Sequence, residues 1–310
     1  MILLIDVTWL HLTNRSVRWT GIEHVCKAVG ALICSVVVLR AVRRIPRYER
    51  ITAKLRYAEV SDTAAWFSLF LCFMSSASIL SYLCVSINAP LVDNSLVRFD
   101  RALGFDWPEV YLWVKSHSQV QQILALAYES GFWQLLAIPA ILGISGCHED
   151  LSEFFVLLML SVILLLIIST PFPATSAFIY FKVADPNTAS TVSDFAILRD
   201  GTMRIFDLRN MQGLVSIPSF HTMLAVLFTY SLRRIRLLFG LAIVINTTMI
   251  VSTLTQGGHY LVDVIAGLLL SVLIIQALRV ANRQRTVVPP AKIGETIACA
   301  TRELFTPTEK

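Results

Sequence analysis

The sequence predicts an all-α fold, a polytopic transmembrane helical bundle, from three observations. Hydrophobic residues make up 55% of the 310 residues and charged residues only 15%, whereas about 25% of an average soluble domain is charged. Several apolar runs approach the ~20 residues that span a bilayer as a helix. Lys and Arg gather between these runs, as they do in the loops of membrane proteins. A soluble protein with one large core would need more charge to cover its surface.

In chain order, the first apolar run covers residues 21–39. It contains Glu23 and Lys27, and its uninterrupted apolar part is too short to cross alone, so the sequence leaves open whether it spans. Six stronger runs follow, and each predicts a spanning helix. They are residues 63–87, 121–144, 154–170, 218–232, 237–254 and 259–278.

These runs divide the chain into three parts. Residues 1–62 form an N-terminal segment with a candidate extra membrane helix and a basic loop. Residues 63–280 form the main membrane domain, and residues 281–310 form a polar tail that contains prolines. No internal repeat or second soluble domain is expected.

The charge of the loops predicts the orientation of the helices. Three clusters of Lys and Arg separate the runs, and the positive-inside rule places all three in the cytoplasm. Segments 88–116 and 172–216 then lie outside, and we expect a multi-pass protein of the cell's inner membrane. The three clusters are Arg40, Arg43, Arg44, Arg47, Arg50, Lys54 and Arg56; Arg233, Arg234 and Arg236; and Arg279, Arg283 and Arg285.

Two histidines occupy matching positions in this arrangement. Residues 221 and 259 are 38 positions apart, which is roughly 57 Å of helix at 1.5 Å per residue. Two crossings of a ~30 Å hydrocarbon core account for that length. We therefore expect His221 and His259 at the same membrane face and at similar depth. A lone histidine at a helix end is usually a polar interfacial residue, but two at matched depth favour a catalytic site.

Asp263 follows His259 by four residues, so we expect both side chains on one face of a helix. A carboxylate inside an apolar run is costly in a membrane and normally faces a partner or a wet cavity. Bonded to His259, it would fix the tautomer of the imidazole and raise the basicity of the other nitrogen. An aspartate that only hydrogen-bonds a neighbouring helix is the alternative.

Backbone groups near both histidines are suited to bind an anion. Pro218 fits the first turn of a helix, where its missing N–H costs nothing, and the free N–H groups of that turn form an anion site. Gly257 and Gly258 would let the backbone approach a phosphate closely. The six cysteines show no CxxC pairing, and we expect no metal site.

Two motifs resemble signatures of the PAP2 (type 2 phosphatidic acid phosphatase) superfamily. Residues 218–221, Pro-Ser-Phe-His, resemble the second signature, Pro-Ser-Gly/Leu-His. Residues 252–263 resemble the third, Ser-Arg-x5-His-x3-Asp, with Thr253 in place of the arginine. The resemblance extends from about residue 90 to residue 278, and it implies that residues 63–280 form a catalytic domain with a six-helix PAP2-like core.

Further details are similar to one branch of that superfamily. Thr253, the ending His-Tyr-x-x-Asp and the Phe-Pro-Ala turn at 172–174 resemble inositol phosphorylceramide synthases and related bacterial proteins. The first signature of other PAP2 members, Lys-x6-Arg-Pro, is not found. The resemblance therefore points to the superfamily more specifically than to a substrate.

The resemblance also implies a mechanism without metal or cofactor. His259 would attack phosphorus and form a phosphohistidine, and Asp263 would stabilise its imidazolium. His221 would protonate the leaving alcohol and then activate the acceptor. The phosphate oxygens need positive charge or N–H donors around them. The candidates are Ser219, Arg199, Arg204, Gly257 and Gly258, although the two arginines are equally well interpreted as solvated loop charges.

We therefore expect an enzyme that acts on a phosphorylated lipid at the extracytoplasmic face of the bilayer. It would release the phosphate to water as a lipid phosphate phosphatase, or transfer a head group to a lipid alcohol as a phosphotransferase. A non-catalytic lipid-binding or transport protein is a third hypothesis, which the presence of His221, His259 and Asp263 together disfavours. No nucleic-acid motif accompanies the net charge of +5, and the sequence indicates no protein partner.

Overall fold

The computed structural model describes residues 1–183 and 189–286, with side chains for residues 1–183 and 194–284. The predicted all-α fold is confirmed, because 76% of the residues are helical and the described part contains thirteen α-helices. Two short strands, β1 (Ser16–Val17) and β2 (Ile205–Phe206), pair in parallel.

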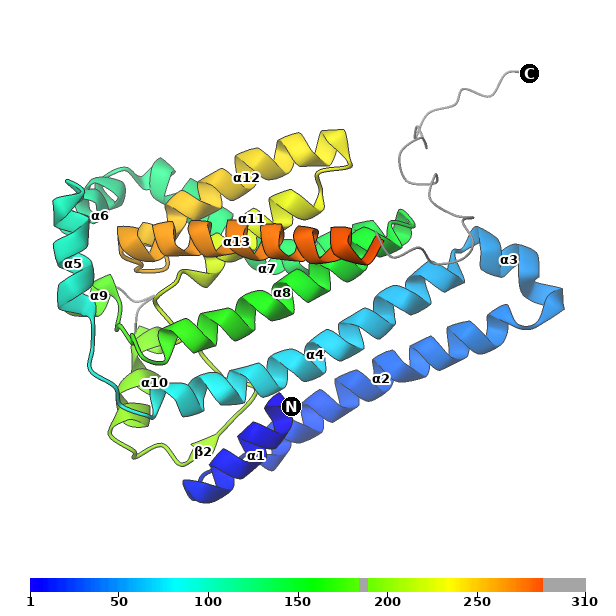
Figure 1. Cartoon of the computed structure of the whole chain (residues 1–310), viewed down its shortest axis with the longest axis horizontal. Helices are drawn as coiled ribbons and strands as arrows, with labels where there is room; N and C mark the ends of the chain where they lie inside the picture. Colours follow the sequence, from blue (N-terminus) through cyan, green and yellow to red (C-terminus); the bar gives the residue numbers. More distant parts are fainter. Residues whose placement is uncertain (184–188, 287–310) are drawn as a thin grey trace.

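Six helices in the described part of the chain are long and apolar enough to cross a membrane. In Figure 1 successive helices of this set run back and forth along the long axis of the molecule. The protein is therefore a polytopic helical bundle. The six helices are α2 (Trp19–Arg43), α4 (Tyr57–Val85), α7 (Ser118–Ile144), α8 (His148–Ser169), α12 (Arg236–Thr255) and α13 (Leu261–Thr286).

The run whose crossing the sequence left open lies within α2. Glu23 and Lys27 lie one turn apart, with 2.7 Å between Oε1 and Nζ, so each charge offsets the other. The 25 residues of α2 extend about 37 Å, which exceeds a ~30 Å hydrocarbon core. Because α2 packs along α4 and little else (Figure 1), most of its apolar surface faces outward.

One predicted spanning run, 218–232, forms a shorter helix than expected. Helix α11 (Phe220–Ser231) has 12 residues, about 18 Å at 1.5 Å per residue. The side chain of Ser219 caps it by accepting a hydrogen bond from the N–H of Thr222. α11 contacts α7, α8, α12 and α13, so it lies inside the bundle and need not match the thickness of the lipid.

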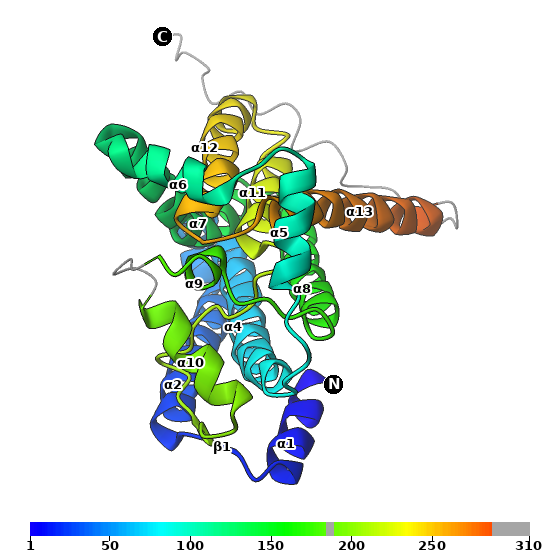
Figure 2. The same cartoon turned by 90° about the vertical axis from the view of Figure 1, so that its left-hand side faces the viewer.

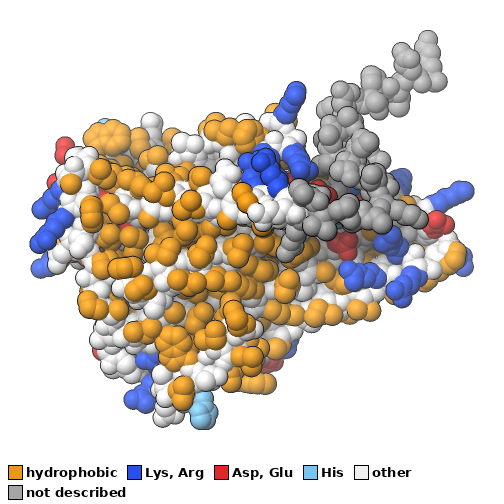
Figure 3. Space-filling view, viewed as in Figure 1, with side chains coloured by type: hydrophobic (Ala, Val, Ile, Leu, Met, Phe, Trp, Pro, Cys, Tyr) orange, Lys and Arg blue, Asp and Glu red, His pale blue; other side chains and the backbone are white. Residues whose placement is uncertain are grey.

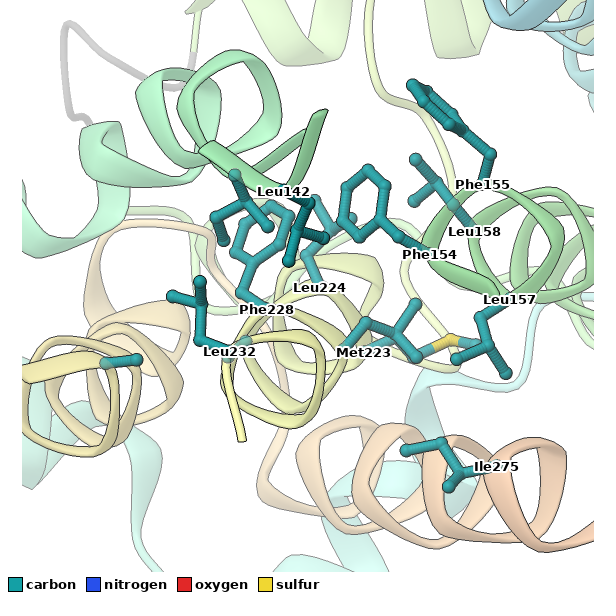
Figure 4. Packing of buried hydrophobic residues seen from close by; sticks show 14 of the residues in the cluster. Leu142, Phe154, Phe155, Leu157, Leu158, Met223, Leu224, Phe228, Leu232 and Ile275 are labelled. Carbon is teal, nitrogen blue, oxygen red and sulfur yellow. The ribbon is translucent and has the colours of Figure 1, made fainter. Parts of the chain in front are cut away.

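The core of the bundle lies between α7, α8 and α11. Figure 4 shows Phe154 of α8 near Leu224 and Phe228 of α11, with Leu142 of α7 beside them and Phe155 of α8 pointing away from α11. All five side chains are at most 5% exposed. Packing of this kind fixes α11, and with it the start of α11, relative to its neighbours.

Four short helices gather at one end of the bundle, which we call the short-helix end (Figures 1 and 2). Two more, with the 3₁₀ helix η1, belong to the N-terminal part of the chain. The four are α5 (Asp93–Ala102), α6 (Trp107–Ser116), α9 (Ala177–Tyr180) and α10 (Ala189–Arg199); the others are α1 (Ile2–Leu12), α3 (Glu49–Lys54) and η1 (Pro46–Tyr48).

The opposite end, which we call the basic end, carries the three predicted basic clusters. Helix α3, the turn between α11 and α12 and the last turns of α13 all lie there (Figure 1). Figure 3 shows Lys and Arg side chains at both ends and hydrophobic side chains over the surface between them. This apolar band is the surface expected to face lipid in a multi-pass membrane protein.

The predicted boundaries between domains can be compared with these elements. The boundary between residues 62 and 63 lies inside α4, which begins at Tyr57. Of the predicted tail 281–310, residues up to Thr286 belong to α13, and residues 287–310 lie outside the described part.

Candidate functional site

His259 and Asp263 meet at the start of α13, at the short-helix end. The helix begins at Leu261, so His259 lies just before it. The sequence predicts His259 on the first turn of the helix, and this prediction is wrong by two residues. The two side chains still meet, with 3.4 Å between His259 Nδ1 and Asp263 Oδ2. His259 is 6% exposed and Asp263 is fully buried. Because Nδ1 faces the carboxylate, Nε2 is the ring nitrogen left for chemistry.

Two further donors hold the Asp263 carboxylate in this position. The N–H of Tyr260 donates to Oδ2 at 3.0 Å, and the hydroxyl of Ser216 donates to the same oxygen at 2.9 Å. Oδ1 is buried and has no partner among the described residues. The backbone carbonyl of Asp263 also accepts from the N–H of Ser219 at 3.0 Å, which ties the start of α13 to the start of α11.

Helix α5 holds the first turn of α13 from outside. The carboxylate of Asp100 accepts from the N–H groups of Leu261 and Val262, each at 3.0 Å, as an N-cap side chain would. Burial raises the pKa of Asp100. Two turns before on the same face, Asp93 accepts from the Tyr260 hydroxyl at 2.7 Å. No motif in the sequence marks either aspartate as part of the site, although their spacing of seven residues puts them on one face of a helix.

His221 lies in the first turn of α11 and is held by an aromatic ring from α7. The rings of Tyr128 and His221 stack with 4.1 Å between their centroids and 22° between their planes. Gly131, nearly one turn after Tyr128, packs closely on Met249 of α12, because a Cβ there would lie 3.2 Å from Met249 Sδ. The stacking fixes the orientation of the imidazole.

Both histidines open into one cavity of about 600 Å³. Its polar end includes Tyr128, Glu129 and Gln256, and its apolar part extends between α4 and α8, where Met74, Leu165 and Leu166 form the wall. Among the described residues that line the cavity, none is Lys or Arg. The two histidines thus face a pocket that is apolar on one side and carries no fixed positive charge.

Of the two glycines predicted to approach a phosphate, Gly257 lines the cavity and Gly258 does not, and both make room for aromatic rings. Gly257 lines the cavity, and a Cβ there would lie 2.9 Å from His259 Cδ2 and 3.1 Å from Tyr128 Cε2. Gly258 has a φ of +64° and packs directly against Phe178. Only glycine adopts this conformation readily and allows this approach.

The other predicted phosphate ligands lie outside the cavity wall. Ser219 is fully buried and caps α11. Arg199 donates from Nη2 to the carbonyl of Ala89 at 2.8 Å, and burial lowers its pKa. Its neighbour one turn earlier, Phe195, is the residue that reaches the cavity. Arg204 is exposed beside β2, where its carbonyl accepts from the N–H of Ser16.

Thr253 stands where the third PAP2 signature has arginine, and it also turns away from the cavity. Its hydroxyl donates to the carbonyl of Ile250 at 2.7 Å. Its own carbonyl accepts from the N–H groups of Gly257 and His259, so the residue shapes the turn that carries His259. Within residues 1–183 and 189–286, no group of three or more His, Cys, Asp or Glu is placed to hold a metal ion.

Comparison with known proteins adds one family. A family model described as PAP2 superfamily matches residues 94–277. Neither a curated protein nor a solved structure matches the chain. The matched residues include His221, His259 and Asp263, together with α5 through most of α13.

Proposed function

This chain belongs to the PAP2 superfamily, and on that premise we propose that it is a membrane enzyme that cleaves lipid phosphate esters through a phosphohistidine. The superfamily supports a phosphatase or phosphotransferase function. One observation carries the finer proposal: His221 and His259 line the same cavity, and Asp263 contacts His259 at the nitrogen that does not react.

In the first step His259 Nε2 attacks phosphorus, and the bond between phosphorus and the leaving alcohol oxygen breaks. His221 donates its proton to that oxygen, and the carboxylate of Asp263 stabilises the imidazolium that forms on His259. In the second step His221 takes a proton from water, the water oxygen bonds to phosphorus, and the bond to Nε2 breaks. Phosphate leaves and both histidines return to their starting states.

The start of α11 is the best candidate for binding the phosphate oxygens. The first four N–H groups of a helix have no partner inside it, and Ser219 accepts from those of Thr222 and Met223. The N–H groups of Phe220 and His221 remain, and both residues line the cavity. A helix N-terminus attracts anions, so this turn can bind phosphate where the cavity wall lacks Lys and Arg.

A lipid is the substrate class that fits the cavity. Its volume of about 600 Å³ lies within the roughly 300–1,000 Å³ of typical ligand pockets. The apolar wall between α4 and α8 suits an acyl chain, while the head group would lie at the histidines. We expect this site to open on the extracytoplasmic side, because it lies at the end opposite the basic clusters (Figure 1).

The first test is phosphate release from a panel of lipid phosphates by the purified protein in detergent. We expect release by the wild type, a fall of about 10²–10⁴-fold for His221→Ala, and loss of activity for His259→Ala. His117→Ala is the matched control, because His117 is exposed at the start of α7. Activity of His259→Ala at the wild-type rate would refute the nucleophile.

Transfer of a head group to a lipid alcohol is the second candidate. The residues at 172–174 and Thr253 resemble phosphotransferases of the inositol phosphorylceramide synthase type, and the apolar wall could hold the acceptor. The assay above, repeated with an added lipid alcohol, separates the two. A phosphorylated lipid product that forms faster than free phosphate favours transfer, and phosphate release unaffected by the alcohol favours hydrolysis.

A further inference from the structure

A second cavity lies on the other side of α11, where α11, α12 and α13 meet. Its volume is about 380 Å³. The wall is mostly apolar, with Val226, Ile250, Val272 and Ile275 among its residues. It shares no residue with the cavity that holds the histidines, so it is a separate site on the same helices.

Asn246 is the unusual residue in this wall. Its side chain is 1% exposed, and neither Nδ2 nor Oδ1 has a hydrogen-bond partner among the described residues. A buried amide inside a membrane helix normally bonds a neighbouring helix, and leaving both of its polar atoms unpaired is costly. The side chain lines the cavity, so a ligand there could accept from Nδ2.

Arg279 brings positive charge to one end of the same cavity. Its guanidinium lies 5.7 Å from the ring centroid of Tyr230. No described carboxylate forms an ion pair with it, whereas Arg233 pairs with Asp150 at 3.0 Å and with Glu153 at 2.6 Å. The charge of Arg279 is therefore available to an anion at the cavity mouth.

The Asn246 amide and the Arg279 guanidinium lie at different depths. Their order along the bundle matches that of the ester carbonyl and the phosphate of a phospholipid. Helices α12 and α13 are antiparallel (Figure 1), and the cavity is lined by residues 243–250 of one and 272–279 of the other. Asn246 is thus level with Gln276, and Arg279 lies about 5 Å closer to the basic end. Beyond Asn246 the wall continues with Ile250 and Val272.

We propose that this cavity binds an anionic phospholipid from the leaflet at the basic end of the bundle. The phosphate lies on Arg279, and an ester carbonyl accepts from Asn246 Nδ2. One acyl chain follows Ile250 and Val272 toward the short-helix end. The lipid is a bound ligand of the bundle and not the substrate, because the cavity is separate from the histidines.

The test measures which lipid stays bound. Purified protein is incubated with equal amounts of dioleoylphosphatidylglycerol and dioleoylphosphatidylcholine in mixed micelles, and retained lipid is counted by native mass spectrometry. We expect the wild type to retain phosphatidylglycerol preferentially. Asn246→Leu and Arg279→Gln should each lower its retention by about tenfold, because each removes a polar contact to the lipid.

Three variants serve as controls and should retain phosphatidylglycerol as the wild type does. Thr248→Val removes a hydroxyl from the same helix outside the cavity, and Arg283→Gln removes a charge one turn beyond Arg279. His259→Ala disables the other cavity. Arg279→Gln alters an exposed side chain, so it decides the question if Asn246→Leu does not fold.

Two results would overturn the proposal. Equal retention of the two lipids by the wild type would show that the site has no preference for an anion. Loss of retention in His259→Ala, with Asn246→Leu and Arg279→Gln unaffected, would place the lipid in the histidine cavity.

Discussion

At the scale of single residues, the Asp263 carboxylate has more partners than a histidine alone requires. The same oxygen receives hydrogen bonds from Ser216 and from the backbone of Tyr260, and it faces His259. The sequence could predict the contact with His259 because four residues separate the two. It could not predict Ser216, because a distance of 47 residues in the chain carries no local signal.

Asp263→Asn tests whether this carboxylate supports the reaction. The amide keeps the shape but not the charge that stabilises an imidazolium, so kcat should fall by about 10³–10⁴-fold with little change in KM. The measurement is steady-state phosphate release, with thermal unfolding as the check on folding. In a His259→Ala background the same substitution should have no further effect, and a kcat near the wild-type value in the single variant would exclude this role.

Tyr128 offers a second test at this scale, because its ring stacks on His221. Tyr128→Phe keeps the ring and should leave kcat near the wild-type value. Tyr128→Leu removes the stacking, worth about 1 kcal/mol, and should lower kcat by roughly fivefold. Equal activity of the two variants would mean that the ring does not position His221.

At the scale of elements, the geometry of the site depends on the ends of helices more than on their middles. Helix α13 starts two residues after His259, and its first N–H groups are bound by Asp100 from α5. The apolar runs predicted that a helix lies here, since long runs give a strong signal. They could not predict the start residue or the cap, because these depend on a segment about 160 residues earlier in the chain.

Asp100→Ala tests this cap. Loss of an N-cap acceptor costs about 1 kcal/mol of stability, and a looser turn at His259 should lower kcat by roughly 10-fold to 100-fold. Asp106→Ala is the matched control, because Asp106 caps α6 by accepting from the N–H of Glu109 at 3.2 Å. A similar fall in kcat for both variants would indicate a general effect of stability instead.

At the scale of the whole molecule, charge and hydropathy predicted most of the fold, whereas less of the site could be predicted from the sequence. The fold class is confirmed, and all three basic clusters lie at one end (Figure 1). The cavity wall could not be predicted, since it combines residues of α4, α7, α8 and α11 that no motif connects. The phosphate ligands expected at Arg199 and Arg204 were inferred from their place in a long loop, which does not specify where a side chain points.

Orientation in the membrane is the prediction that belongs to this scale. In a background with the exposed Cys26, Cys34 and Cys72 changed to Ser, Thr202→Cys should react with a membrane-impermeant maleimide in intact cells. Arg47→Cys should react only after the membrane is opened. Thr202 is exposed at the short-helix end and Arg47 at the basic end, so the reverse labelling would invert the proposed topology.

Helix α4 has a consequence for how this protein relates to its family. The family match begins at residue 94, yet Met74, Ala77 and Ser78 of α4 form part of the wall of the histidine cavity. A chain trimmed to the matched residues would keep both histidines and lose one side of the pocket. Under the proposed function, we therefore expect homologues with the same motifs but a different segment before them to share the reaction and to select different lipids.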